Sequence, residues 1–231
     1  MVLPSGALVD ARTRSELGDQ ALDEVLAGLW PGDCQSCGNS LGAAAPALAI
    51  DDLQVITRAS LHHPACRPPQ WNDSWTITAP STGLVTWRTV VLLLPFQQGN
   101  QVIRPAGLLV NPGLEELWLA RAPDGWHPCL EPSFAAAGLT PPSAGMPIRM
   151  PASGVAGRVD QTALTASVEG RTEIYGSEAE PQIRAAATEL EGFLLIVTHA
   201  ADPAQISPGR VMYALASPLT LVGWAGMRSA R

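Results

Sequence analysis

The chain has 231 residues, of which 46% are hydrophobic and 15% are charged, and its formal net charge is −7 at pH 7. A chain of this length can bury a hydrophobic core without disulfide support, and no run of about 18 apolar residues predicts a transmembrane helix. All 14 basic residues are arginines, and they form no basic stripe along the sequence, so binding to nucleic acid or to an anionic membrane surface is not expected.

The cysteine content and the first residues indicate the cellular compartment that is expected for the protein. Four cysteines are too few for a disulfide scaffold in a chain of this size. The opening residues, MVLPSGALVDARTR, lack the charged start and the long apolar stretch of a secretory signal. We therefore expect a cytoplasmic protein whose cysteines are reduced.

An amphipathic helix is expected over residues 14–30. Apolar residues recur at helical spacing from Leu17 to Leu29, and acidic residues lie away from this face. Thr13 and Glu16 have the spacing of a capping box at the N-terminus of a helix. The pattern predicts a helix that packs one face on a core.

The largest concentration of possible metal ligands in the sequence follows this helix. Cys34 and Cys37 bracket two residues, and after 25 more residues His63 and Cys66 bracket two others. Each bracket lets a tight turn point two donors at one ion, and Gly38 tolerates the positive φ that often follows such a pair. Three thiolates and one imidazole form the closed tetrahedral set that is typical of structural Zn²⁺.

Alternatives to this zinc site remain open. His62, which three residues separate from Cys66, is the alternative to His63 as the fourth ligand, although the two-residue bracket of His63 matches the first pair and favours His63. Cys34 and Cys37 could instead form a redox pair, although that motif normally opens a helix after a strand. The residues between the two pairs, PALAIDDLQVITRASL, predict two short strands around a turn at Asp51 and Asp52.

The pattern Cys-x2-Cys…His-x2-Cys resembles zinc-knuckle modules, and the HPAC of residues 63–66 is similar to the second ligand pair of the first zinc module in LIM domains. The resemblance covers residues 33–67, and it implies a structural zinc site at the four residues of the pattern. No further Cys-x2-Cys follows, so the second LIM module is absent. The chain as a whole resembles actinobacterial proteins, a likeness that implies no function.

The remainder of the chain is rich in predicted strands. The run from Val90 to Leu94 is apolar at every position, which predicts a strand buried on both faces. A helix is expected to begin at Pro181 and to end with Gly192 as its C-terminal cap. Residues 135–154, rich in Ala, Pro, Gly and Ser, are the best candidate for a linker or loop. The apolar or β-branched runs lie at residues 84–96, 106–110, 116–120, 155–168, 193–199 and 210–226.

These patterns predict an α+β protein with an N-terminal helix, a small zinc module, and a mainly antiparallel β domain with one or two short helices. The expected division is residues 1–75 and residues 76–231, unless the chain forms one continuous domain. The expected function is that of a non-enzymatic zinc-binding adaptor whose partner is a protein. The aromatic side chains of Trp71 and Trp75 are the candidate contacts for that partner.

Two other functions compete with the adaptor. A hydrolase could use an open zinc position, or a nucleophilic set of Cys129, His199 and Asp202. Nucleic-acid binding would need an arginine cluster that folding assembles from Arg58, Arg67 and Arg88.

Overall fold

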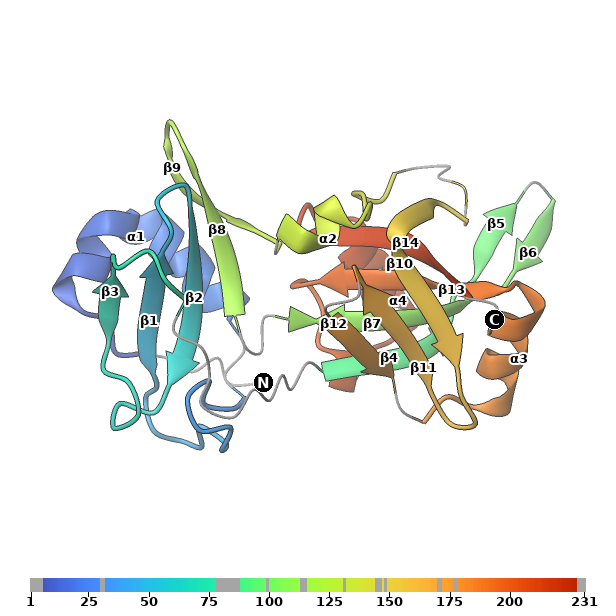
Figure 1. Ribbon diagram of the computed structural model, residues 1–231, viewed down its shortest axis with the longest axis horizontal. Coiled ribbons are helices and arrows are strands. Elements are labelled where there is room, and N and C mark those ends of the chain that lie inside the picture. Colours follow the sequence, from blue (N-terminus) through green and yellow to red (C-terminus); the bar gives the residue numbers. More distant parts are fainter. Residues whose placement is uncertain are drawn as a thin grey trace. The chain divides into compact units, whose positions relative to one another are not determined.

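We describe a computed structural model of the chain, which covers residues 6–29, 32–77, 88–98, 100–112, 116–130, 132–143, 147, 149–169, 172–176 and 178–227. The chain divides into two compact units. Unit 1 comprises Met1–Trp87 and Pro112–Leu130, and unit 2 comprises Arg88–Asn111 and Glu131–Arg231. The α+β prediction is confirmed: one long helix precedes a chain that is mostly strands with a few short helices (Figure 1).

Helix α1 (Ala11–Gly28) opens unit 1. It starts three residues earlier than predicted because Asp10, not Thr13, is the N-cap. The Asp10 carboxylate accepts hydrogen bonds from the backbone amides of Arg12 (2.9 Å) and Thr13 (3.1 Å). The helix is kinked at Gly18, whose φ of +73° is left-handed and suits a residue without a Cβ. Trp30 and Pro31, at the predicted end of the helix, lie outside the described residues.

A five-stranded sheet with the order β3-β1-β2-β8-β9 completes unit 1. The predicted hairpin is confirmed, but its turn lies at residues 53–55, because Asp51 and Asp52 still belong to the first strand. Strand β3 runs parallel to β1, and the other neighbours are antiparallel. The strands are β1 (Ala47–Asp52), β2 (Ile56–His62), β3 (Gln70–Asn72), β8 (Glu116–Ala122) and β9 (Gly125–Cys129).

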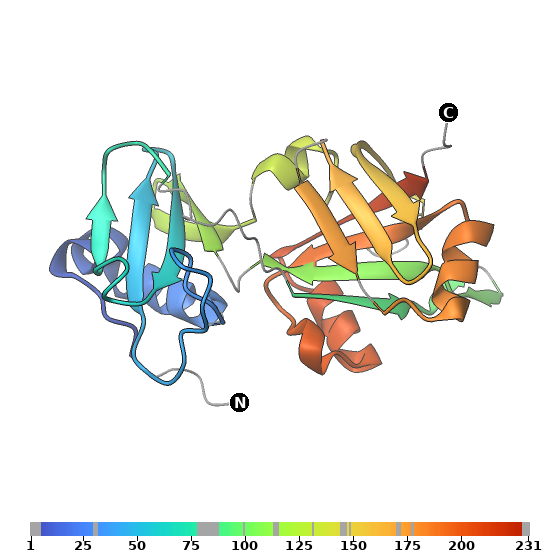
Figure 2. The same ribbon diagram turned by 60° about the horizontal axis from the view of Figure 1, so that its bottom comes forward.

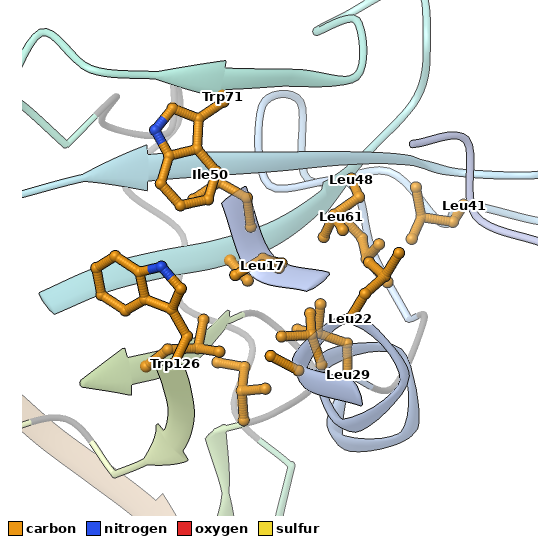
Figure 3. Close-up of a cluster of buried hydrophobic side chains, with 14 of the residues drawn as sticks. Leu17, Leu22, Leu29, Leu41, Leu48, Ile50, Leu61, Trp71 and Trp126 are labelled. Atoms are coloured by element: carbon orange, nitrogen blue, oxygen red, sulfur yellow. The ribbon is translucent and has the colours of Figure 1, made fainter. Parts of the chain in front are cut away.

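The core of unit 1 lies between α1 and the sheet. Leu22 of α1 and Leu29, the residue that follows this helix, face Leu48 and Leu61 of the β1–β2 hairpin (Figure 3). The fully buried aliphatic side chains each contribute about 1.5–3 kcal/mol to folding. The indoles of Trp71 and Trp126 close one side of the cluster, with ring centroids 6.0 Å apart. Cys34 belongs to the same cluster, so the metal-ligand loop is attached directly to the core.

Unit 2 is built on a seven-stranded sheet with the order β12-β11-β10-β14-β13-β7-β4. In Figure 2 the β10–β11–β12 strands, coloured yellow to orange, face the layer that contains β4 and β7, coloured green. The sheet nearly closes into a barrel, because the Thr89 hydroxyl on β4 donates a hydrogen bond to the Tyr175 carbonyl on β12 (2.8 Å). The strands are β4 (Arg88–Leu93), β7 (Ala106–Asn111), β10 (Pro151–Val159), β11 (Leu164–Val168), β12 (Thr172–Gly176), β13 (Gly192–Thr198) and β14 (Thr220–Met227).

Short elements surround this barrel-like sheet. A small hairpin pairs β5 with β6, and short α-helices and a 3-10 turn connect the strands. None of the described helices is long and apolar enough to cross a membrane. These elements are β5 (Phe96–Gln98), β6 (Gln101–Ile103), α2 (Pro132–Ala136), α3 (Pro181–Glu189), η2 (Pro203–Gln205) and α4 (Pro208–Leu215).

Three local predictions for unit 2 were wrong. Strand β4 is not buried on both faces: it lies at one end of the strand order, and Thr89–Leu93 are all partly exposed. The apolar run 210–226 begins as helix α4, because the Ser207 hydroxyl caps the Arg210 amide. The predicted cap at Gly192 is wrong, because the C-cap of α3 is Leu190 and Gly192 is the first residue of β13. A glycine is needed there because a Cβ would lie 2.6 Å from the Ala225 carbonyl oxygen. The predicted strand start at residues 84–87 lies outside the described residues.

His199, just after β13, is a buried ionisable group of unit 2. Its side chain is 5% exposed, and neither ring nitrogen has a hydrogen-bond partner among the described residues. Burial lowers the pKa of His199 to about 4. Between that value and the ordinary pKa of about 6.5, the unfolded chain binds a proton that the native state does not. The free energy of unfolding therefore falls as the pH falls below about 6.5.

Replacing His199 with leucine is expected to stabilise unit 2 at pH 7.5 and to flatten its pH dependence. The wild type should lose about 2 kcal/mol between pH 7.5 and pH 5 through this residue, and the variant should lose that much less. Hydrogen exchange of the β13 amides at the two pH values measures the difference. His127→Leu, at an exposed histidine of unit 1, is the control, and an equal pH response in all three proteins would contradict the assignment.

Candidate metal centre

Two tight turns of unit 1 gather the Cys/His donors. Cys34 and Cys37 lie in the loop between α1 and β1, and His63 and Cys66 lie just beyond the end of β2. The three sulfurs and one His63 nitrogen all lie within 4.8 Å of one another. Cys34 is buried, Cys37 and His63 are half-buried, and Cys66 is exposed. Folding therefore brings together the two pairs that the spacing predicted.

Backbone hydrogen bonds shape both turns. The Gly38 amide donates to the Cys34 carbonyl (2.8 Å), and the Cys34 amide donates to the Asn39 carbonyl (2.8 Å). Gly38 has a φ of +72°, as expected for the residue after the second cysteine. In the second turn the amides of Cys66 and Arg67 both donate to the His63 carbonyl, at 2.9 and 3.0 Å. Each pair of donors is thus held by the main chain and not by side-chain packing alone.

The His63 ring is oriented by its second nitrogen. Nε2 lies 3.0 Å from the Ser40 carbonyl oxygen, which can only accept a hydrogen bond. In the neutral ring Nε2 therefore carries the proton, and the lone pair of Nδ1 faces the sulfurs. When the ring is protonated, Nδ1 carries a proton as well and donates a hydrogen bond to the Cys37 sulfur. Fixing the tautomer of a ligating histidine through its other nitrogen is a common feature of metal sites.

The donor separations fit a tetrahedral ion. Zn–S bonds of about 2.3 Å and Zn–N bonds of about 2.0–2.1 Å place N and S about 3.6 Å apart around tetrahedral zinc. His63 Nδ1 lies 3.5 Å from the Cys37 sulfur and 3.9 Å from the Cys66 sulfur. The cluster can therefore hold a metal ion such as zinc through three sulfurs and one nitrogen.

The protonation states of the donors bear on metal binding. A hydrogen bond from the Asn39 backbone amide, with a further one from His63, lowers the pKa of Cys37 to about 7. Desolvation, together with the neighbouring sulfurs, raises the pKa of Cys66 to about 11. A hydrogen bond to Cys37 raises the pKa of His63. One thiolate forms easily, but further negative charge beside it requires a positive ion at the centre.

A buried ion pair attaches the second turn to the sheet. Arg67 follows Cys66 directly, and its guanidinium contacts both carboxylate oxygens of Asp51 on β1, at 2.5 and 3.3 Å. Asn72 donates to the same carboxylate (2.9 Å), and the Gln70 amide oxygen, in the orientation that suits its neighbours, accepts from Arg67. This ion pair could not be predicted from the two residue types alone, because its partners are 16 residues apart in the chain.

His62 lies outside the donor cluster and supports it through hydrogen bonds to two serine hydroxyls. Its Nδ1 lies 2.9 Å from the Ser36 hydroxyl, between the two cysteines of the first turn, and its Nε2 lies 2.9 Å from the Ser60 hydroxyl on β2. Burial, together with the charges of Arg67 and Arg58, lowers the pKa of His62 to about 4. The neutral ring therefore links the first turn to β2, while the adjacent His63 faces the sulfurs.

Replacing His62 with alanine is expected to weaken metal binding about 10- to 100-fold, because the first turn loses its link to β2. Competition with a chromophoric zinc chelator measures the affinity. His127→Ala is the matched control, since His127 is an exposed histidine of the same unit and lies outside the cluster. Equal affinities for the two variants would show that the hydrogen bonds of His62 do not support the metal centre.

The other residues of functional interest differ in burial and in the unit to which they belong. Trp71 is buried, with its indole nitrogen donating to Asp52 (3.2 Å), whereas Trp75 is 64% exposed. Cys129 belongs to unit 1, and both His199 and Asp202 belong to unit 2. Among the three arginines that could meet a nucleic acid, Arg58 and Arg67 are buried and paired with Glu116 and Asp51.

No protein-family model matches this chain, and neither does any curated protein or any solved structure. The function is therefore inferred from the geometry of the Cys/His cluster.

Proposed function

We propose that unit 1 is a zinc-stabilised, non-enzymatic protein-interaction module. The observation that carries the proposal is the closed donor set: three sulfurs and an oriented His63 nitrogen would fill all four positions of a tetrahedral Zn²⁺. A catalytic zinc keeps one position for water or substrate. The bound ion would hold the two turns together, and its binding free energy would contribute to the folding of unit 1.

The chemistry of Cys129, the cysteine outside the donor cluster, supports a non-enzymatic role. Burial raises the pKa of Cys129 to about 11, so this thiol is a poor nucleophile at neutral pH. Arg58 and Arg67 are engaged with carboxylates, which leaves them unable to neutralise phosphates. A protein is therefore the favoured partner.

The surface that would meet this partner lies at one end of the unit 1 sheet. Because β3 runs parallel to β1, the chain leaves both strands at the same end, into the turn with Val55 and into the loop with Trp75 and Ile77. These three apolar side chains are 73%, 64% and 41% exposed. Aromatic anchors of this kind are enriched at interfaces.

Hydrogen bonds hold the loop that presents Trp75. Asn72 donates to the Thr76 carbonyl (3.2 Å), the Ser74 and Thr76 hydroxyls lie 2.7 Å apart, and Asp73 pairs with Arg12 of α1 (2.7 Å). Trp75 itself has a φ of +58°, a conformation that is unusual for a bulky residue. A loop that hydrogen bonds already hold in place costs little backbone entropy to order when a partner binds it.

Zinc K-edge X-ray absorption tests the closed site. We expect three Zn–S distances of about 2.3 Å and one Zn–N distance of about 2.0–2.1 Å, with no additional oxygen ligand. Two or more oxygen or nitrogen ligands would indicate an open position, and the hydrolase alternative would then replace the proposal.

Photo-crosslinking tests the contact surface. With p-benzoylphenylalanine in place of Trp75, we expect discrete protein adducts in cells, because the side chain would lie within the interface. The control carries the same group in place of Tyr175, which is 54% exposed in unit 2. Identical adducts from both positions, or none from position 75, would remove this surface from the proposal.

A further inference from the structure

Unit 2 contains an apolar cleft that is independent of the metal centre. It lies between the segment that joins β4 to β5 and the segment that joins η2 to α4, and its volume is about 470 Å³. Small-molecule pockets usually have volumes of roughly 300–1,000 Å³. The cleft, called here the α4 cleft, is lined by residues 92–97 on one side and by Ile206, Ser207, Val211, Met212 and Leu215 on the other.

The floor of the α4 cleft is the hydrophobic core itself. Leu94 and Val211 are each 3% exposed and form part of the core cluster of unit 2. At the mouth, Met212 is 62% exposed, although its side chain is apolar. Leu94 and Val211 belong to the same core cluster as Leu109, Leu194, Ile196 and Val222, which do not line the cleft. Methionine is common at apolar binding surfaces because its flexible side chain adapts to the ligand.

The lining selects the chemistry of the occupant. Among the described residues that line the cleft, none is charged, and the polar side chains are those of Gln97 and Ser207. The Ser207 hydroxyl already accepts a hydrogen bond from the Arg210 amide at the start of α4 (3.4 Å). A peptide segment would bring backbone N–H and C=O groups that need partners once buried, and leaving one unpaired costs about 1–3 kcal/mol. An alkyl chain brings no such groups.

We propose that the α4 cleft binds the alkyl chain of one free single-chain lipid, with the polar end of the lipid at the mouth beside Met212. The driving force is the removal of apolar surface from water. Affinity should rise about fourfold for each added methylene, the equivalent of about 0.8 kcal/mol. The rise should stop once the chain fills the cavity.

Displacement of cis-parinaric acid, a fluorescent single-chain lipid with one polar end, from the full-length protein tests the proposal, with saturated 1-alkanols of 8 to 14 carbons as competitors, a range of about the size that such a pocket holds. We expect saturable probe binding and a chain-length series with the slope given above. Met212→Glu, which places a charge at the mouth, should weaken probe binding at least tenfold. Tyr213→Glu is the matched control, because Tyr213 is 71% exposed on the same helix and does not line the cleft.

A second variant and a second lipid source complete the test. Ile206→Trp would fill the cleft from a half-buried loop position, and it should also weaken binding while the thermal unfolding temperature changes little. Neutral phosphatidylcholine vesicles should not cosediment with the protein. The proposal is overturned if no saturable probe binding occurs, if the glutamate variants at positions 212 and 213 bind equally well, or if the protein binds vesicles but not free chains.

Discussion

Replacing Cys34 with serine is expected to abolish tight metal binding and to unfold unit 1. Cys34 is 1% exposed, and it belongs both to the donor cluster and to the hydrophobic core. Structural zinc sites have apparent binding free energies of about 10–16 kcal/mol, most of which is coupled to folding. A serine hydroxyl is a poor ligand for zinc in place of a thiolate, so the variant should lose the ion and the cooperative unfolding of this unit.

Cys129→Ser is the matched control for this variant. Cys129 is a free, partly buried cysteine of the same unit, and it lies outside the cluster. It should keep its metal and lose at most about 1 kcal/mol, because a hydroxyl of similar size replaces a thiol that is only partly buried. Metal analysis and thermal unfolding of both variants measure the difference. A Cys34→Ser protein as stable as the wild type would point to a redox role for Cys34 and Cys37.

Replacing Arg67 with methionine is expected to destabilise unit 1 by about 3–5 kcal/mol, because the carboxylate of Asp51 is left buried without its cation. Asp51 is 0% exposed and Arg67 is 5% exposed, so solvent screens the pair little. The metal affinity should also fall, since Arg67 directly follows the ligand Cys66. Urea unfolding of the zinc-loaded protein measures the stability.

A double-mutant cycle with Asp51→Leu, Arg67→Met and the combined variant measures the interaction energy of the pair apart from the effects of each single substitution. The combined Asp51→Leu and Arg67→Met variant should be more stable than the Arg67→Met variant, because neither charge remains buried. Arg158→Met is the control at an exposed pair, that of Arg158 with Asp160, and it should cost less than about 0.5 kcal/mol. A loss below about 1 kcal/mol in Arg67→Met would show that the ion pair does not hold the second turn.

The local patterns of the sequence predicted the metal-ligand cluster well. The two-residue brackets at Cys34 and Cys37 and at His63 and Cys66 reflect the geometry of a single turn, and that geometry is set within a few residues. The choice between the adjacent histidines could not be made in this way. It depends on which ring meets the Ser40 carbonyl and which meets Ser36 and Ser60, and those contacts require the folded sheet.

Tertiary contacts explain the predictions for unit 2 that failed. An apolar run such as Val90–Leu94 predicts burial, but it cannot show that β4 lies at the end of a sheet beside an open cleft. Gly192 has the residue type of a helix cap, and Glu191 takes the left-handed conformation instead, with a φ of +55°. The glycine is needed one residue later, where the Trp224 ring and the Ala225 carbonyl leave no room for a Cβ.

Native mass spectrometry of protein purified without added metal tests the central claim most directly. The account predicts one zinc ion per chain, retained through buffer exchange and lost when unit 1 is unfolded in acid, as expected for Cys34, Cys37, His63 and Cys66 acting together on one ion. A chain that carries no zinc, yet shows the same thermal unfolding before and after incubation with zinc, would contradict the account.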